Sequence, residues 1–228
     1  MNPTKWNSIA AEYSSVREAT RILVFKHVRE LIRIRQTRRL LDYGGGDGTF
    51  ATICADIPAL EIVSFDPSPN MVALARKNCQ GFPQIAVVDS TMGLGSGVFD
   101  AITLHAVWMC LPTARECAKV LADVRRLLAP SGILYASVTH PCFRTERFSS
   151  YYTDFNLRDY LKDGTHFGVT IVGGDRELKI VDTHWSLGAM VMQLAQVGLA
   201  VSDITELPDL PQGEGMGSPW MIVTARLC

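Results

Sequence analysis

The sequence predicts an α/β domain in which a mostly parallel sheet is covered by helices on both faces. Strand-like and helix-like segments alternate between about residue 39 and residue 139. A glycine cluster, "GGGDG", follows directly on the first apolar strand-like run. Alternation of this kind is typical of parallel sheets, because successive parallel strands need a long crossover connection, usually a helix. The 228 residues suit a single domain, 1–228, with a modest insertion.

The composition is that of an ordinary globular protein and argues against several classes of partner. Hydrophobic residues make up 47% of the chain, and 22 Lys and Arg residues stand against 23 Asp and Glu residues, for a net charge of -1. This balance offers no general attraction to nucleic acids or anionic membranes. The first residues lack a secretory pattern, and no apolar stretch reaches the roughly 18 residues of a spanning helix. We therefore expect a cytoplasmic protein without nucleic-acid or membrane partners.

The elements before the insertion follow from hydrophobic periodicity and capping signals. Residues 1–38 are predicted to form an N-terminal helical segment. Strands are predicted at residues 39–43, 61–65, 84–88, 99–105 and 133–139. Helices are predicted from Thr49 to Ala55, after an N-cap at Ser68, and after an N-cap at Thr113. The stretch "APSG", residues 129–132, predicts a turn before the fifth strand.

The regular alternation stops at residues 141–185, which we expect to form a small cap over a pocket. Within this segment, "GVTIV" and "LKIVD" are typical of paired strands around a "GGD" turn. Residues 186–197 then predict a helix that ends at Gly198. The residues expected on the inner face of this helix are Leu187, Met190, Val191 and Leu194. Two strands, residues 199–207 and 219–227, close the chain.

The turn after the first strand carries the pattern D-x-G-x-G-x-G, from Asp42 through Gly44 and Gly46 to Gly48. Glycine adopts positive φ without a clash, and its missing side chain lets the backbone approach a ligand closely. The N-terminus of the next helix presents free N–H groups, and ligands of open parallel sheets bind at this edge. A dinucleotide fingerprint fails, because Thr49 occupies its third glycine position. The pattern therefore predicts a ligand-binding turn and disfavours a nicotinamide-dependent reductase.

Acidic residues end the next two strands. Asp66 lies roughly 20 residues beyond the glycines, where a carboxylate accepts both hydroxyls of a ribose. Asp89, beside Ser90, ends the third strand, where a carboxylate meets an adenine amino group. Together with the glycine turn, these positions predict a site for a ligand that contains adenosine.

These motifs, in this order, resemble those of the class I S-adenosylmethionine-dependent methyltransferases, particularly the small-molecule branch. "LLDYGGGDG" is similar to the family's first motif, "FDPSPNMVALAR" to its second and "VVDS" to its third. "FDAITLHAVWMCL" is similar to its strand-four motif, and "VRRLLAPSGILYASVTHPCF" to its strand-five region. The resemblance implies a Rossmann-like seven-stranded sheet, mostly parallel, with one antiparallel strand at its edge. It also implies S-adenosyl-L-methionine as the cofactor.

The resemblance also assigns candidate roles to individual residues. The expected cofactor-binding residues are Tyr13, Asp42, Gly44, Gly46, Asp66, Met71, Asp89, Ser90 and His105. Tyr13 lies in "WNSIAAEY", similar to the family's opening, whose tyrosine often reaches the cofactor carboxylate. Asp42 either reaches the cofactor's amino group through water or only braces the turn. Met71 packs against adenine or belongs to the core, and His105 lines the methyl-transfer site or serves packing.

The predicted function is methyl transfer to an oxygen or nitrogen atom of a small molecule that enters under the cap. The sulfonium already makes the methyl group electrophilic, so the protein mainly aligns the reactants and excludes water. His140, after the fifth strand, is the candidate general base for a protonated acceptor; alternatively, it orients the cap through a hydrogen bond. Cap aromatic residues either form a wall for the acceptor or a small core: Tyr151, Tyr152, Phe155, Tyr160 and Phe167.

Two other interpretations stay open. A methyltransferase for nucleic acid or protein is disfavoured by the balanced charge and by "LHAV" in place of an acidic-proline tetrapeptide. A non-catalytic scaffold that binds S-adenosylmethionine is disfavoured by the intact acids and glycines. The six cysteines show no CxxC pair, which favours reduced thiols. A metal site at His140 and Cys142 is disfavoured, because no second ligand pair lies at a suitable spacing. We expect a monomer or a homodimer.

Overall fold

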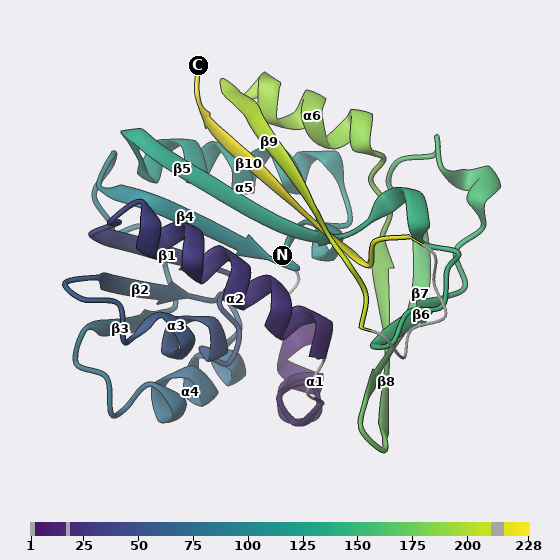
Figure 1. Cartoon of the computed structure of the whole chain (residues 1–228), viewed down its shortest axis with the longest axis horizontal. Helices are drawn as coiled ribbons and strands as arrows, with labels where there is room; N and C mark the ends of the chain where they lie inside the picture. Colours follow the sequence, from purple (N-terminus) through teal and green to yellow (C-terminus); the bar gives the residue numbers. More distant parts are fainter. Residues whose placement is uncertain (1–2, 17–18, 211–216) are drawn as a thin grey trace.

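The computed structural model describes residues 3–16, 19–210 and 217–228. Its main sheet has seven strands in the order β3-β2-β1-β4-β5-β10-β9 (Figure 1). The strands are β1 Arg39–Tyr43, β2 Glu61–Phe65, β3 Ile85–Val88, β4 Phe99–His105, β5 Leu128–Thr139, β9 Leu199–Leu207 and β10 Trp220–Leu227. The predicted fold class, a seven-stranded and mostly parallel sheet, is thus confirmed.

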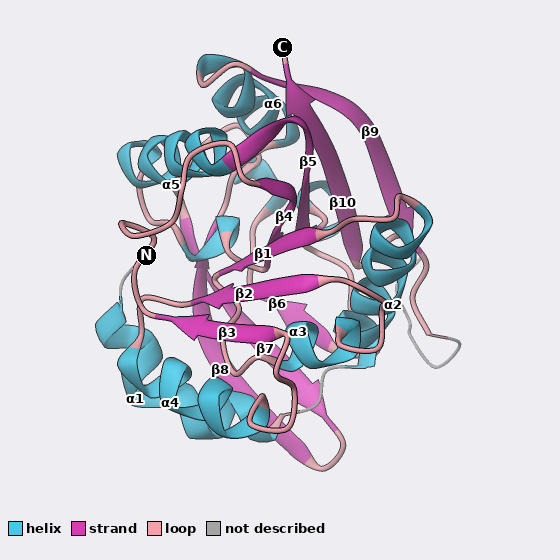
Figure 2. Ribbon diagram, turned by 90° about the vertical axis from the view of Figure 1, so that its left-hand side faces the viewer, coloured by secondary structure: helices cyan, strands magenta, loops and turns pink. Residues whose placement is uncertain are grey.

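Helices cover both faces of this sheet, as the pattern predicts. The helices are α1 Pro3–Ser15, α2 Ala19–Ile34, α3 Thr49–Cys54, α4 Pro69–Asn78, α5 Ala114–Leu127 and α6 Leu187–Gln196. Short 3₁₀ turns are formed by Trp108–Cys110, Pro141–Phe143 and Leu157–Asp159. Helices α5 and α6 contact each other on one side of the sheet, and α2 and α3 contact each other on the opposite side (Figure 2). No helix among the described residues is long and apolar enough to cross a membrane.

Two capping predictions explain where helices begin. The Ser68 hydroxyl accepts a hydrogen bond from the Met71 N–H at 3.3 Å at the start of α4. Pro69 follows in the first turn, where its missing N–H costs no hydrogen bond within the helix. The Thr113 hydroxyl accepts from the Glu116 N–H at 3.2 Å at the start of α5. Both predicted N-caps are confirmed, and they fix the ends of the two helices relative to the sheet.

The antiparallel strand is not at the edge, contrary to expectation. Strand β10 pairs antiparallel with both β5 and β9, so it lies between them. Because β9 and β10 are consecutive and pair with each other, the addition of β10 to β5 leaves β9 as the edge strand. The edge of the sheet is therefore a strand that runs parallel to β1–β5.

The predicted turn at residues 129–132 is wrong, because these residues continue β5. The pairing of β4 with β5 shifts from Phe99–Leu128 to Ala101–Ile133, so several extra residues of β5 face a short stretch of β4. Pro130 and Ser131 are exposed in this bulge. The turn-forming residues thus mark an irregularity within a strand and not its start.

The inner face predicted for α6 is wrong at one position. Met190 and Leu194 are buried, but Val191 is 37% exposed. Gln193 is buried instead, and its side-chain oxygen accepts a hydrogen bond from Trp108 Nε1 at 2.7 Å. A paired polar side chain is therefore buried against the 3₁₀ turn Trp108–Cys110, while the apolar Val191 lies outside.

The cap contains a second, antiparallel sheet in the order β6-β7-β8. Strand β7 His166–Gly173 pairs with β8 Arg176–Thr183 around Gly174, which has φ +62°, so the predicted pair is confirmed. Strand β6 Tyr151–Thr153 is too short to give a periodic signal in the sequence. The cap has its own apolar core, formed by Val16, Phe148, Tyr151, Phe155, Phe167, Val169, Ile171, Leu178 and Ile180. Of the five cap aromatics, three belong to this core and Tyr152 and Tyr160 are partly exposed.

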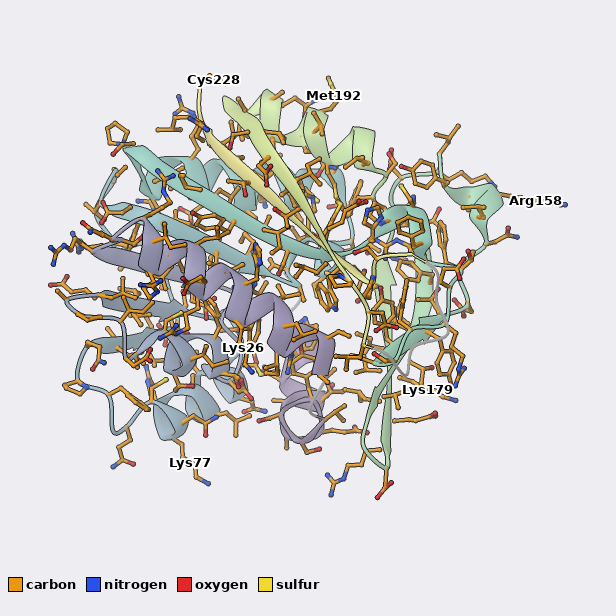
Figure 3. The ribbon with its side chains drawn as sticks, in the orientation of Figure 1. Lys26, Lys77, Arg158, Lys179, Met192 and Cys228 are labelled. Atoms are coloured by element: carbon orange, nitrogen blue, oxygen red, sulfur yellow. The ribbon has the colours of Figure 1, made fainter. Side chains whose placement is uncertain are left out.

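Strand β8 alternates between buried and exposed residues from Leu178 to Asp182. Leu178 and Ile180 are buried, whereas Lys179 and Val181 are exposed. Figure 3 shows Lys179 on the outside of the cap, and Lys26, Lys77 and Arg158 project to solvent from α2, α4 and the 3₁₀ turn of the cap. These labelled basic side chains are thus dispersed over separate elements and not gathered on one face.

Candidate functional site

A cleft of about 620 Å³ lies at the carboxyl ends of β1, β2 and β4. This is the edge at which open parallel sheets bind ligands. The cleft is lined by Trp6, Tyr13, Arg21, Phe25, Asp42, Gly44, Gly45, Gly46, Asp47, Thr49, Phe50, Asp66, Met71, His105, Ala106, Val107 and Cys110. Seven predicted site residues are among them: Tyr13, Asp42, Gly44, Gly46, Asp66, Met71 and His105.

The glycine turn has the backbone geometry that its sequence predicts. Gly44, Gly46 and Gly48 have φ of +78°, +57° and +79°. The N–H groups of Gly44 and Gly45 both donate to the carbonyl of Phe65, at 2.7 and 2.9 Å, which ties the turn to the end of β2. The positive φ values require glycine, since a Cβ would be strained there. The turn thus exposes backbone along one side of the cleft.

Asp42 lies beneath this turn in a fully buried position. Its Oδ1 accepts a hydrogen bond from the Thr103 hydroxyl at 2.9 Å. Its Oδ2 is buried and has no hydrogen-bond partner among the described residues. Burial raises the pKa of Asp42 to about 7, and the charges of Asp66 and Asp47 add to the rise, while the bond from Thr103 opposes it. A buried acceptor of this kind stabilises a ligand that brings a hydrogen-bond donor or a positive charge.

Asp66 is held at the end of β2 by two backbone donors. The Gly46 N–H donates to Oδ2 at 3.0 Å, and the Ser68 N–H donates to Oδ1 at 2.8 Å. Burial raises the pKa of Asp66, and these two hydrogen bonds oppose the rise. Each carboxylate oxygen keeps further lone-pair capacity, so the fixed carboxylate can accept two hydroxyl groups from a ligand in the cleft.

Helix α1 covers the cleft. Asn7 Oδ1 accepts from the Ser68 hydroxyl at 2.6 Å, and the Ser14 hydroxyl donates to Asp47 Oδ2 at 2.7 Å. These two bonds attach the first half of α1 to Ser68, beyond β2, and its second half to Asp47 in the glycine turn. Asp47 was not predicted as a site residue, although it lies inside the glycine pattern.

Tyr13 meets a cation that the sequence analysis missed. The guanidinium of Arg21 lies 4.7 Å from the centre of the Tyr13 ring and donates a hydrogen bond to the Tyr13 hydroxyl. Trp6 packs edge-on against the same ring, with centroids 5.2 Å apart. Arg21 is the one Lys or Arg side chain among the lining residues of the cleft. No local pattern marked it, because its role depends on the contact between Arg21 of α2 and Tyr13 of α1.

His105 lies at the end of β4 in an aromatic environment. Its Nδ1 is 2.7 Å from the Ser137 hydroxyl, and its ring centre lies 4.8 Å from that of Phe25 and 4.2 Å from that of Phe50. Nε2 is buried without a hydrogen-bond partner among the described residues. Burial lowers the pKa of His105 to about 3, and the positive charge of Arg21 contributes. The imidazole is therefore neutral at physiological pH.

A second cavity of about 370 Å³ adjoins the cleft and extends beneath the cap. It is lined by Trp6, Tyr13, Ala106, Met109, Cys110, Thr139, Tyr151, Val169, Ile171, Ile180, Asp182 and Trp220. The residues common to both linings are Trp6, Tyr13, Ala106 and Cys110. The second cavity is mostly apolar, and Asp182 is the one carboxylate in its lining.

Three predicted site residues lie outside both linings. Asp89 and Ser90 are exposed at the end of β3, and the Ser90 hydroxyl accepts from the Met92 N–H at 3.2 Å. His140 is buried, with Nε2 2.8 Å from Glu206 Oε1, and its Nδ1 accepts from the Cys142 N–H at 3.2 Å. Both ring nitrogens of His140 thus have partners within the protein.

The described residues contain no group of three or more His, Cys, Asp or Glu side chains arranged to hold a metal ion. The polar chemistry of the two cavities therefore lies in three carboxylates of the cleft, Asp182, Arg21 and a neutral histidine. Such charged groups suit a small zwitterionic or cationic ligand.

Residues 41–136 match the family model described as "Methyltransferase domain". The chain is 35% identical over 108 residues to "Protein-L-isoaspartate O-methyltransferase 2" of Marinobacter nauticus, covering 45% of this chain and 48% of that protein. It is 27% identical over 118 residues to "Demethylmenaquinone methyltransferase" of Chlorobaculum tepidum, covering 50% of this chain and 46% of that protein. The chain thus aligns with about half the length of each of these curated relatives.

Solved structures share the fold over nearly the whole chain. The CcbJ methyltransferase of Streptomyces caelestis superposes with a TM-score of 0.69 at 14% identity, over 98% of this chain and 96% of that one. The 1,6-didemethyltoxoflavin-N1-methyltransferase of Burkholderia thailandensis superposes with a TM-score of 0.63 at 16% identity, over 99% and 86%. That structure contains 1,6-didemethyltoxoflavin and S-adenosylhomocysteine. At these identities the likeness establishes the fold.

Proposed function

We propose that this chain, which has the domain and fold of the class I S-adenosylmethionine-dependent methyltransferases, transfers a methyl group from S-adenosylmethionine to an oxygen or nitrogen atom of a small molecule. The observation that carries the proposal is the shared wall of the two cavities, formed by Trp6, Tyr13, Ala106 and Cys110. A polar cleft for a methyl donor thus adjoins an apolar cavity for an acceptor. Methyl transfer requires this arrangement, since the two reactants must meet in line.

The residues of the cleft fit the cofactor. The braced carboxylate of Asp66 would accept the ribose hydroxyls, and Asp42, with its unpartnered buried Oδ2, would receive the amino group. Arg21, with Tyr13, would hold the carboxylate by charge-assisted hydrogen bonds. Glycine at 45 leaves room for the backbone to lie against Asp42.

The adenine position extends the proposal toward β3. Met71 lines the cleft, and the Asp66 N–H donates to the Val88 carbonyl at 3.3 Å, so the ends of β2 and β3 are adjacent. An adenine ring beyond a ribose on Asp66 would thus reach the region of Asp89 and Ser90. Their predicted roles stay proposals, because both side chains lie outside the cleft lining.

When bound, S-adenosylmethionine supplies a methyl group activated by its sulfonium. The chain's own residues would bind the cofactor and the acceptor, orient them toward each other and exclude water. Trp6 and Tyr13 of α1 cover the junction, which limits the access of water. His105, neutral because burial lowers its pKa to about 3, places no positive charge beside the sulfonium. The rings of Phe25 and Phe50 around it keep this part of the cleft apolar.

The lining and enclosure of the second cavity support a small acceptor. Its lining is mostly apolar, and the cap strands β7 and β8 form part of its wall. Two similar proteins are named for small acceptors, demethylmenaquinone and 1,6-didemethyltoxoflavin. One relative is named for protein-L-isoaspartate, which keeps a protein acceptor as a second candidate. The cytoplasmic location and the monomeric or homodimeric state stay predictions.

Calorimetry with S-adenosylmethionine and S-adenosylhomocysteine tests cofactor binding directly. We expect the Asp66→Ala variant to bind either compound about 10- to 100-fold more weakly, because hydrogen bonds to a charged group are lost. Glu61→Gln is the matched control, since Glu61 lies exposed at the opposite end of the same strand. If the folded wild-type protein bound neither compound, the proposal would be overturned. The interpretation of the chain as a non-catalytic scaffold that binds S-adenosylmethionine would be overturned as well.

Transfer of a labelled methyl group tests the acceptor class. The protein is incubated with labelled S-adenosylmethionine and, separately, with a small-molecule extract, with protein and with RNA. We expect label only in the small-molecule fraction. Label in the protein fraction would favour the second candidate, and label in RNA would contradict both.

A further inference from the structure

We propose that Asp182 recognises the methyl acceptor, and that it selects flat apolar molecules carrying a hydrogen-bond donor, above all a protonated nitrogen. The inference rests on the proposed function and specifies the substrate class of the second cavity. It follows from the strand register of β8, the state of the other polar groups in the cavity and the buried cation Arg144.

The register of β8 places a carboxylate where an apolar side chain is expected. Leu178 and Ile180 face the cap core, and Val181 and Lys179, which is labelled in Figure 3, are exposed. By the two-residue period of a strand, Asp182 shares the inner face with Leu178 and Ile180. It is 3% exposed and lines the cavity. A carboxylate on an apolar face costs stability, so a role in binding gives a physical reason for its presence.

The other polar groups of the cavity are engaged within the protein. The Tyr151 hydroxyl donates to the Pro219 carbonyl at 2.5 Å, and Trp220 Nε1 donates to the Thr20 hydroxyl at 3.0 Å. The Thr139 hydroxyl accepts from Arg144 Nη1 at 3.0 Å. The polar tips of these lining residues point to protein partners, and their apolar bodies form the wall. Asp182 is the one carboxylate in the lining, so it is the side chain that distinguishes one acceptor from another by charge.

Arg144 supports the charge of Asp182 from behind the cavity wall. It is 1% exposed, and its guanidinium lies 4.6 Å from the centre of the Phe167 ring. Burial lowers the pKa of Arg144 to about 10, and attraction from Asp182 is among the effects that oppose this fall. The guanidinium therefore stays protonated at neutral pH, and the same attraction favours the ionised form of Asp182.

The remaining walls define the shape of the acceptor. Met109, Val169, Ile171 and Ile180 offer flat apolar contact between the cap sheet and the 3₁₀ turn after β4. A planar ring would fill this space by burial of its faces. With its donor group on Asp182, the acceptor atom would point toward the wall shared with the cofactor cleft. Asp182 would thus fix orientation, as a positioning residue that binds the acceptor without taking part in the transfer.

Three naphthalene probes of different charge test this inference. 1-Naphthylmethylamine carries an ammonium, 1-naphthalenemethanol a neutral hydroxyl and 1-naphthoate a carboxylate. Their binding to the protein saturated with S-adenosylhomocysteine is measured by calorimetry. We expect the ammonium to bind most tightly and the carboxylate least, with at least about a tenfold difference between the two. Equal affinities of the wild-type protein for the three probes, or a preference for the carboxylate, would overturn the inference without any variant.

The Asp182→Asn variant removes the charge and keeps the shape. We expect it to bind the ammonium probe about 10- to 100-fold more weakly, with the affinity for S-adenosylhomocysteine unchanged. Asp175→Asn is the matched control, because Asp175 is exposed in the turn between β7 and β8. Unchanged preference among the probes in a variant that still binds S-adenosylhomocysteine would contradict the role of Asp182. If the wild-type protein did not bind S-adenosylhomocysteine, that result would instead count against the proposed function. The probe series would then be run on the unliganded protein.

Discussion

Gly45 lies directly against the Asp42 carboxylate. A Cβ on Gly45 would lie 2.7 Å from Asp42 Oδ2 and 3.2 Å from Asp42 Cγ, and it would also contact the Ser64 hydroxyl. The missing side chain at 45 thus allows the turn to pack onto a buried acid. This close packing holds the acid against the turn that forms the cleft, and it leads to a first prediction.

Gly45→Ala is expected to lower the free energy of unfolding by about 1–3 kcal/mol, because the added methyl group overpacks a buried site. Gly81→Ala is the control, since a Cβ there meets nothing within 4 Å and needs no unusual φ. The double variant Gly45→Ala, Ser64→Ala should recover part of the loss, because the Ser64 hydroxyl has no hydrogen-bond partner among the described residues. Urea denaturation measures all three. Equal stability of the Gly45 and Gly81 variants would refute the packing argument.

Asp42→Asn is expected to stabilise the unliganded protein at neutral and higher pH. Folding raises the pKa of Asp42 from 3.8 to about 7, so the folded state binds more protons than the unfolded state between these values. The wild type therefore loses stability as pH rises through this window, and the full cost is present above about pH 7. About three pKa units correspond to about 4 kcal/mol. The variant, which cannot ionise, avoids this cost.

Denaturation curves of the wild type and the Asp42→Asn variant at about pH 4.5, 6 and 8 check this. The difference between them should grow with pH. Parallel pH profiles would show that Asp42 does not titrate in this range. Calorimetry should show weaker binding of S-adenosylhomocysteine by the variant, since the acceptor for the amino group is changed.

Ser14→Ala is expected to loosen α1 over the cleft. Ser14 donates to Asp47 Oδ2, whereas Ser15 bonds only within the helix, to the Glu12 carbonyl. Ser15→Ala is thus the same change one residue away. Loss of a hydrogen bond to a charged group costs about 1.5–3 kcal/mol. Hydrogen exchange of residues 3–16 should accelerate in the first variant and not in the second, and similar exchange in both would disprove the contact's importance.

His140→Gln is expected to affect stability more than catalysis. Both ring nitrogens have protein partners, Glu206 and the Cys142 N–H, and the ring lies outside both cavities. Burial lowers the pKa of His140, against the effect of Glu206. We expect about 1–2 kcal/mol lower unfolding free energy and a transfer rate within about threefold of wild type. A rate loss of about 100-fold or more, typical of a removed general base, would instead support the catalytic role predicted from the sequence.

The sequence predicted the parts of the site that depend on local geometry. Positive φ at Gly44 and Gly46 follows from a tight strand-to-helix turn, and Asp66 follows from its place at a strand end. The caps at Ser68 and Thr113 are likewise local. Each of these depends on a few consecutive residues, so each leaves a readable pattern.

The residues that were missed depend on long-range packing. Arg21 lines the cleft beside Tyr13 of α1, and Asp182 lines the second cavity because β8 of the cap packs against the 3₁₀ turn Trp108–Cys110. The bulge in β5 is a further case, since "APSG" has turn-forming residues and only pairing with β4 shows that it continues the strand. Charge and periodicity do not report which distant elements meet.

The separate apolar core of the cap has a consequence for redesign. A cap with its own core can be exchanged between related proteins as a unit, provided that every segment contributing to that core is exchanged with it. Residues 3–16 connect the cap to the cofactor cleft. Ile9 and Val16 pack with the cap core, while Asn7 and Ser14 form hydrogen bonds to residues beside the cleft. A chimera that takes residues 141–185 from a relative but keeps its own residues 3–16 would thus contain a mismatched cap core. The two segments should be exchanged together.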